Sequence, residues 1–229
     1  MKKLKVLIGC EESQEVMKAF LKLGHEAISC DLKPCSGGYT ERHFQGDVFE
    51  AIKGGKLIMQ DGNEINVGKW DVAIFHPECT YLTVSANKWY KDQPDRKSGT
   101  LVGAERREAR EKAIKFVLDL YNSDIEYIRI ENPIGVLSSR WRKPDNVLQP
   151  WMFGHGETKA TCLWNKNLPP IIPTNIVEGR EQKLHLLPPS KNRAELRSKT
   201  YPGIAKAIAE QTVAYLLQKS KNIKVRSCN

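Results

Sequence analysis

The chain has 229 residues, 40% of them hydrophobic, which suits one domain with a substantial core and leaves too little length for two. Its formal net charge of +9 fits either a well-solvated mixed surface or contact with an anionic polymer such as nucleic acid. There is no long apolar span or secretory leader, and the six cysteines lack paired short spacings. These features argue against a membrane protein or a disulfide framework, and we expect a reducing, cytoplasmic compartment.

The first part of the chain predicts a β-α-β unit. Lys5 to Ile8 is a strand pattern, Gly9 to Ser13 a turn, and the helical spacing that follows ends at Gly24. His25 to Cys30 is a second strand pattern, closed by Asp31. An acid about 20 residues beyond the first turn is typical of adenosine-ribose binding, but without the glycine fingerprint a purely structural unit explains the pattern equally well.

Two strands and an insert are expected next. Residues 43 to 48 predict a short strand ending in an acid, and Asp61-Gly62 between apolar runs predicts a hairpin insert over residues 55 to 68. Val72 to Phe75 is a short apolar run that stops at His76-Pro77, because proline cannot donate to a strand ladder. This run predicts a buried central strand.

The second half of the chain continues the alternation of helices and strands. We expect a polar loop over 86–103, a long amphipathic helix over 104–121 with a solvated charged face, a strand over 125–130, a basic loop over 140–150, a short strand over 160–164 and a closing helix over 204–217. The sequence therefore predicts one α/β domain over residues 1–229.

Reactive side chains follow two of these strands. Cys79 comes just after the central strand, and Glu131 ends the strand over 125–130 beside Asn132-Pro133. If the two strands are neighbours, both side chains lie at the carboxyl edge of the sheet, where open α/β sheets bind ligands. A thiolate and a carboxylic acid together suit attack on an electron-poor ring such as C6 of a pyrimidine. A cysteine in this position is also commonly inert packing.

A metal site has less support. His76-Pro77-Glu78 has the H-x-E form of nucleobase deaminases, but the downstream P-C-x-x-C that completes their zinc site is missing. Cys30 and Cys35 could join a metal site only with partners that the sequence does not identify. We expect no metal.

The order of these pieces resembles the DNA (cytosine-5) methyltransferases, and in particular short, single-domain forms encoded by phages and prophages. The proline-cysteine motif of that family resembles residues 76–80, its Glu-Asn-Val motif resembles residues 131–133, its Gly-Asp-Ile piece resembles residues 46–48, and its last motif resembles residues 201–205. The resemblance covers most of the chain in the same linear order. It implies a Rossmann-like fold of the kind found in S-adenosylmethionine (SAM)-dependent methyltransferases, with a mostly parallel sheet and helices on both faces.

The resemblance also implies a reaction and a set of site residues. Cys79 would add to C6 of cytosine, Glu131 would hold its amino group and N3, and SAM would be the cofactor that methylates C5. Asp31 would contact the cofactor ribose and Asp47 its adenine. The implied cofactor-binding residues are Gly9, Cys10, Glu11, Asp31, Asp47 and Pro77, and the implied substrate-binding residues are Ser85, Lys88, Trp89, Asn132, Pro133, Lys159 and Thr161. The partner would be DNA, single-stranded or weakly specific duplex, in the cytoplasm of a bacterial host.

Three departures from the family pattern keep other functions open. Glu78 stands where the family has proline, residues 10–13 replace a glycine-rich turn, and residues 165–197 are too few for a large target-recognition domain. A carboxylate beside Cys79 raises the pKa of the thiol unless it is turned away or paired. The alternatives are C5 modification of a free pyrimidine nucleotide and a catalytically silent methyltransferase-like protein that binds nucleic acid or another partner.

Overall fold

The computed structural model describes residues 2–188, 190 and 193–226. A seven-stranded sheet contains, in spatial order, β3 (His43–Gln45), β2 (Glu26–Asp31), β1 (Lys5–Gly9), β6 (Val72–Phe75), β7 (Ile128–Pro133), β9 (Thr161–Lys166) and β8 (Asn146–Leu148). Neighbouring strands from β3 to β7 are parallel, whereas β9 is antiparallel to both β7 and β8. A separate antiparallel hairpin contains β4 (Gly55–Ile58) and β5 (Glu64–Val67), as predicted.

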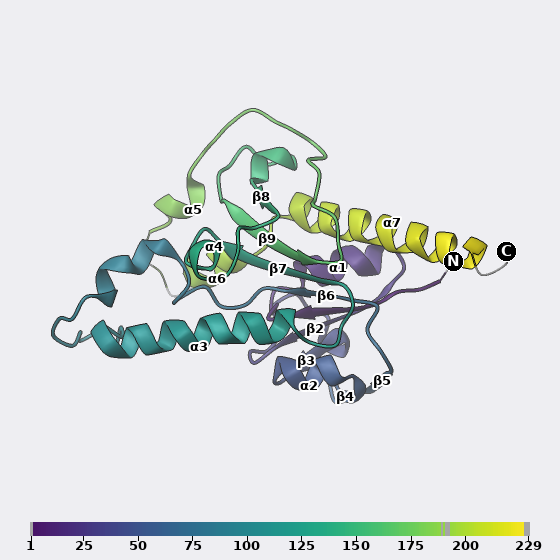
Figure 1. Ribbon diagram of the computed structural model, residues 1–229, viewed down its shortest axis with the longest axis horizontal. Coiled ribbons are helices and arrows are strands. Elements are labelled where there is room, and N and C mark those ends of the chain that lie inside the picture. Colours follow the sequence, from purple (N-terminus) through teal and green to yellow (C-terminus); the bar gives the residue numbers. More distant parts are fainter. Residues whose placement is uncertain (1, 189, 191–192, 227–229) are drawn as a thin grey trace.

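Helices cover both faces of the sheet (Figure 1). The α-helices are α1 (Glu15–Lys22), α2 (Val48–Lys53), α3 (Gly103–Tyr121), α4 (Leu137–Arg140), α5 (Lys183–Leu186), α6 (Arg193–Ser198) and α7 (Pro202–Arg226), and the 3-10 helices are η1 (Thr40–Arg42), η2 (Val84–Tyr90) and η3 (Pro150–Met152). The predicted fold class is therefore confirmed: a Rossmann-like α/β fold with a mostly parallel central sheet.

The period-two pattern of the strands divides the core into two layers. In β6, Val72 and Ile74 pack with the apolar side chains of α1 and α7, whereas Ala73 and Phe75 pack with those of α2 and α3. Every residue of β6 is buried because both faces of the parallel sheet are covered. This burial explains why an uninterrupted apolar run predicted the strand with its observed bounds.

Several expected bounds were wrong. The closing helix α7 runs beyond both ends of the predicted range 204–217, and β9 ends two residues later than predicted. The strand predicted over residues 43–48 ends at Gln45, because the Asp47 side chain accepts a hydrogen bond from Phe49 N and caps α2 instead. The basic stretch over 140–150 contains β8 and so is only partly a loop. β7 starts at Ile128 and runs through to Pro133, which pairs with Thr161 of β9. A proline lacks only the N–H donor, so a strand can include it as the last residue.

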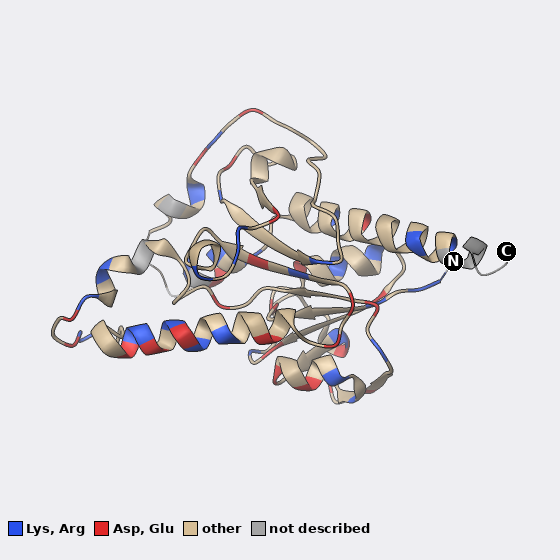
Figure 2. Ribbon diagram, in the orientation of Figure 1, with Lys and Arg blue, Asp and Glu red and all other residues tan. Residues whose placement is uncertain are grey.

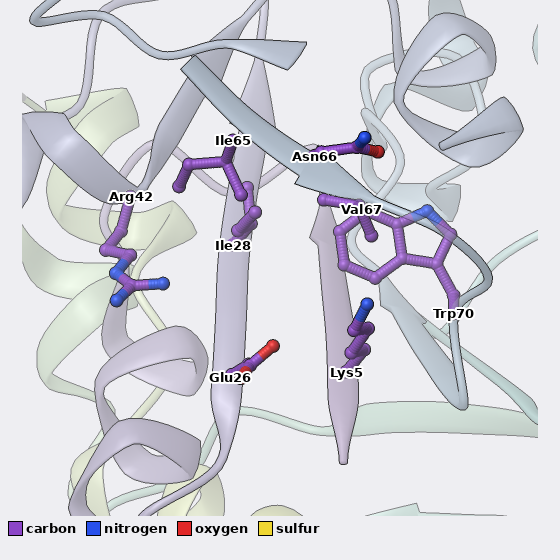
Figure 3. Close-up of a pocket in the computed structure, with 8 residues that line it drawn as sticks. All are labelled: Lys5, Glu26, Ile28, Arg42, Ile65, Asn66, Val67 and Trp70. Atoms are coloured by element: carbon purple, nitrogen blue, oxygen red, sulfur yellow. The ribbon is translucent and has the colours of Figure 1, made fainter. Parts of the chain in front are cut away.

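A small hollow lies beneath the hairpin (Figure 3). Lys5 and Glu26, the first residues of β1 and β2, line it together with Ile65 of β5 and Trp70. It therefore lies at the amino ends of the parallel strands. The side chains singled out in the sequence follow the carboxyl ends, at the opposite edge of the sheet.

No helix in the described part of the chain is long and apolar enough to cross a membrane. The five described cysteines are all free thiols, and Cys228 lies outside the described residues.

Candidate active site

The central strands end at a common edge of the sheet, and the loops that follow them are tied together. β6 pairs in parallel with β1 on one side and β7 on the other. The backbone N–H of His76 donates to Gly9 O at 2.9 Å, and that of Val136 donates to Leu82 O at 2.8 Å. Since parallel strands put their carboxyl ends at one edge, the loop bearing Cys79 lies beside the end of β7 that bears Glu131, as expected for neighbouring strands.

The β1–α1 turn gives Glu11 a structural task. Its carboxylate accepts hydrogen bonds from Val16 N at 2.7 Å and Met17 N at 3.2 Å, and its residue is 4% exposed. Burial raises the pKa of Glu11 to about 7, opposed by the charge of His76 and by the two backbone hydrogen bonds. Glu11 therefore caps the amino end of α1, and each of its carboxylate oxygens accepts a backbone hydrogen bond there.

Four residues of the predicted cofactor site gather around the ends of β1, β2 and β3. Burial is the main cause that raises the pKa of the Cys10 thiol, and the charges of Asp31, Cys30 and Asp47 raise it further. These three groups therefore lie close to Cys10. A Cβ on Gly9 would lie 2.5 Å from the Phe75 ring and 2.7 Å from Val48. Glycine is thus required here for β1 to approach β6 and α2 closely.

Asn132 of β7 links the strand that carries Glu131 to the loop that carries Cys79. Its buried side chain donates from Nδ2 to Pro77 O at 2.8 Å. The side chain of Glu131, the preceding residue, faces His76, with 3.3 Å between Oε2 and Nδ1. Pro77 is thus held by β7 and forms part of the scaffold between Glu131 and Cys79.

Cys79 is an exposed residue with acids nearby. Desolvation raises the pKa of its thiol, as do the charges of Glu131 and Glu78, whereas the charge of Lys159 lowers it. Glu78 itself accepts a hydrogen bond from Thr80 Oγ1 at 2.6 Å. The carboxylate that replaces the family's proline is therefore paired, although its charge still acts on the thiol.

Lys159 and Thr161 lie beside Glu131. Together with Glu131, Thr200, Tyr201 and Ile204 they line a small hollow. Lys159 Nζ donates to Lys199 O at 3.0 Å, and burial lowers the pKa of Lys159 while the charges of Glu131 and Cys79 raise it. One amine therefore acts on both members of the predicted catalytic pair.

The other predicted substrate-binding residues lie in η2 or within the sheet. Trp89 in η2 has Arg96 3.8 Å and Lys88 4.6 Å from its ring centroid, so cations cover it. Pro133 is paired within the sheet. Ser85 lies in η2, and its side chain is outside the described residues.

Two features of the site escaped the sequence patterns. The sequence patterns place His76 at a strand end, in the motif over 76–80 and as a zinc-ligand candidate, whereas in the structure it pairs with Glu131. The charged face of α3 is mixed in sign (Figure 2), as expected for a solvated face, but Arg106 on this helix is 3% exposed. Arg106 donates to Thr80 O at 3.1 Å, and its guanidinium lies 5.2 Å from the Tyr81 ring centroid. Its spacing of four from Arg110, which donates to Tyr81 O, is the one local signal that these two side chains act together.

Solved structures of other proteins resemble this chain. Neither the family models nor the curated proteins match the chain. Among solved structures, a chain from E. coli assigned as a DNA modification methyltransferase encoded within a prophage matches with a TM-score of 0.45 and 13% identity. The match covers 77% of this chain and 52% of that one, so this chain spans about half the length of the matched protein. A similarity of this size carries no information on activity or substrate.

Proposed function

We propose that the protein is a SAM-dependent methyltransferase that transfers a methyl group to C5 of cytosine in DNA, through a covalent bond between Cys79 and C6. One observation carries the proposal: the adjacent ends of β6 and β7 bring Cys79 and Glu131 to the same edge of the sheet, with Lys159 acting on both charges. A soft nucleophile and a hydrogen-bonding carboxyl group are what addition to a pyrimidine ring needs.

The residues at the ends of β1, β2 and β3 suit the adenosyl cofactor. The carboxylates of Asp31 and Asp47 offer acceptors for ribose hydroxyls and an adenine amino group. Gly9, Cys10 and Pro77 would line the same space, whereas Glu11 would act through α1, whose first turn it caps. When bound, SAM would supply the methyl group in electrophilic form.

The chain's own groups account for the steps on the base. Cys79 Sγ bonds to C6, the C5–C6 π bond opens, and N3 gains a proton while Glu131 holds the amino group. Lys159 stabilises the developing thiolate and the ionised carboxylate. After methylation, C5 loses its proton to solvent, the Sγ–C6 bond breaks and N3 releases its proton. The product is 5-methylcytosine, and Cys79 is restored.

DNA is the substrate that the charge of the chain favours. Four basic side chains lie around Trp89 and Tyr90, beside the Cys79 loop: Lys88, Arg96, Arg107 and Arg110. Lysine and arginine side chains of this kind bind phosphates of nucleic acids. A cytosine within a duplex would have to be flipped out of the stack. In the described part of residues 165–197 the helices after β9 are short, α5 with four residues and α6 with six, and this favours weak sequence selectivity.

A free pyrimidine nucleotide is the second candidate substrate, because it would require no recognition domain. Trapping separates the two: DNA containing 5-fluorocytosine should form a SAM-dependent covalent adduct, whereas the fluorinated nucleotide should not. If only the nucleotide formed an adduct, the substrate would be the free nucleotide and not DNA. Calorimetry with SAM and S-adenosylhomocysteine tests the cofactor site directly, and absence of binding to both would leave a catalytically silent protein.

A further inference from the structure

We propose that His76 supplies, through Glu131, the proton that N3 of the cytosine takes up when Cys79 adds to C6. The proposal deepens the proposed function and rests on it. Its basis is the contact between His76 Nδ1 and Glu131 Oε2 at 3.3 Å, between the first residue after β6 and a residue of β7.

Three strands hold the backbone that carries the imidazole. The backbone N–H of His76 is bonded to Gly9 of β1, and the following Pro77 is bonded to Asn132 of β7. The side chains of His76 and Glu131 are only 10% and 18% exposed. A proton shared by the two groups is therefore largely shielded from solvent, yet Glu131 also lines the hollow beside Lys159.

Three charged groups face the ring. They are Glu131 from β7, Glu11 from the β1–α1 turn and Lys159 from the segment before β9. Burial lowers the pKa of His76, but the hydrogen bond and charge of Glu131, with the charge of Glu11, outweigh it, so the net shift is upward. Burial raises the pKa of Glu131, but His76 and Lys159 outweigh it and the net shift is downward. The resting pair therefore holds its proton on the imidazole.

This distribution of charge creates the need for a relay. An ionised Glu131 can accept the amino hydrogen of cytosine but has no proton to give N3. Nε2 of His76 is buried without a hydrogen-bond partner among the described residues. Among the described residues no acceptor lies at Nε2, so the proton that can move is the one on Nδ1, which faces Glu131.

One proton moves from His76 through Glu131 to N3 and back in each turnover. As the Sγ–C6 bond forms and the C5–C6 π bond opens, the Nδ1–H bond breaks, Glu131 Oε2 takes the proton, and the resulting carboxylic acid passes it to N3. When the Sγ–C6 bond later breaks and C5 has lost its proton to solvent, N3 returns its proton to Glu131 and the imidazolium forms again. Neither residue is consumed in a turnover.

The test compares His76→Asn with the wild type in steady-state methylation of a cytosine-containing oligonucleotide. Asparagine keeps a donor near Nδ1 but carries no transferable proton. We expect kcat to fall about 100-fold or more, the range of general acid catalysis, while KM for DNA changes by less than about threefold. His25→Asn is the matched control, because His25 is a buried histidine at the far end of β2 that accepts a hydrogen bond from Leu4 N.

The pH profile gives a readout that a merely structural role would not change. In the wild type, kcat/KM should rise with the thiolate fraction below the pKa of His76 and level off above it, because loss of the imidazolium then offsets the gain of thiolate. This break should be absent in His76→Asn. An NMR titration adds a measurement independent of turnover: Glu131→Gln should lower the pKa of His76.

The outcomes are distinct. If the wild type transfers no methyl group, the proposed function fails and the relay fails with it. If the wild type is active and His76→Asn matches its kcat and its pH break, the relay alone is overturned. A pKa of His76 that is unchanged by Glu131→Gln would likewise overturn it.

Discussion

Asn132 and Pro77, 55 positions apart in the chain, are joined by a hydrogen bond of 2.8 Å from the Asn132 amide to the Pro77 carbonyl oxygen. Pro77 lies two residues before Cys79, and Asn132 directly follows Glu131. This bond therefore sets the distance between the loop that carries the proposed nucleophile and the strand that carries the proposed acid. It is buried, so its loss leaves a carbonyl group without a partner.

Replacing Asn132 with alanine should separate the two halves of the site. We expect a loss of about 1–3 kcal/mol in the free energy of unfolding and a fall in kcat, with SAM affinity unchanged. Asn146→Ala is the matched control, since Asn146 makes a similar amide-to-carbonyl bond, to Ile171 O at 3.0 Å, away from the site. Urea unfolding and methylation assays check this, and equal kcat losses in both variants would contradict the role of Asn132.

Replacing Cys79 with serine should abolish methyl transfer and covalent trapping by 5-fluorocytosine DNA. An alkoxide forms far less readily than a thiolate, so the nucleophile is lost while the fold is kept. The free energy of unfolding should change by less than about 0.5 kcal/mol, because the residue is exposed. Cys35→Ser serves as control, and a fully active Cys79→Ser enzyme would remove the central assignment.

Replacing Glu131 with glutamine should lower kcat about 100- to 10,000-fold while the protein remains folded, because the amide can still accept a hydrogen bond from His76 but cannot carry a proton to N3. Rapid-quench measurement of the methylation step and a circular dichroism melt check both halves of this expectation. Unchanged turnover would mean that the two strand ends do not share a site.

The raised pKa of Glu11 should make the free energy of unfolding depend on pH. Its folded-state pKa is about 7, raised from 4.5 chiefly by burial, so the folded state binds this proton more tightly than the unfolded state. The associated stability is present below about pH 4.5 and is lost as pH rises through 7, to a total of about 3 kcal/mol. Denaturant unfolding between pH 4.5 and 8 should show this loss for the wild type relative to Glu11→Gln, and Glu12→Gln, at a partly buried neighbour, should behave like the wild type.

Lysine should not be able to replace Arg106 on α3. Lysine cannot reproduce a planar group that bonds to Thr80 O and Leu101 O and lies over the Tyr81 and Tyr90 rings. We expect Arg106→Lys to cost about 1–3 kcal/mol of stability and to lower kcat through the Cys79 loop. Arg140→Lys, at an exposed ion pair with Glu111, should change neither by much. Thermal melts and kcat values for both variants distinguish a buried clamp from a solvated charge.

The sequence alone determined much of the sheet. Val72 to Phe75 was predicted with its observed bounds, because a strand buried on both faces must be apolar throughout and the following proline ends it. The β-α-β unit and the Asp61-Gly62 hairpin were predicted for equally local reasons: a strand-to-helix change of period and a turn that favours glycine, whose φ here is +86°. Such patterns depend on residues within one element.

The tertiary structure decided what the side chains contact. Asp47 could end a strand or cap a helix, and only the packing of α2 against the sheet selects the cap. Glu11 could contact a cofactor or cap a helix, and in the folded chain its carboxylate caps α1. His76 and Glu131 are 55 positions apart, and no sequence pattern reveals their contact. The contact forms because β6 and β7 become neighbours in the sheet. Local propensity fixes the elements, whereas charge pairing across them depends on burial and strand order, which no single segment encodes.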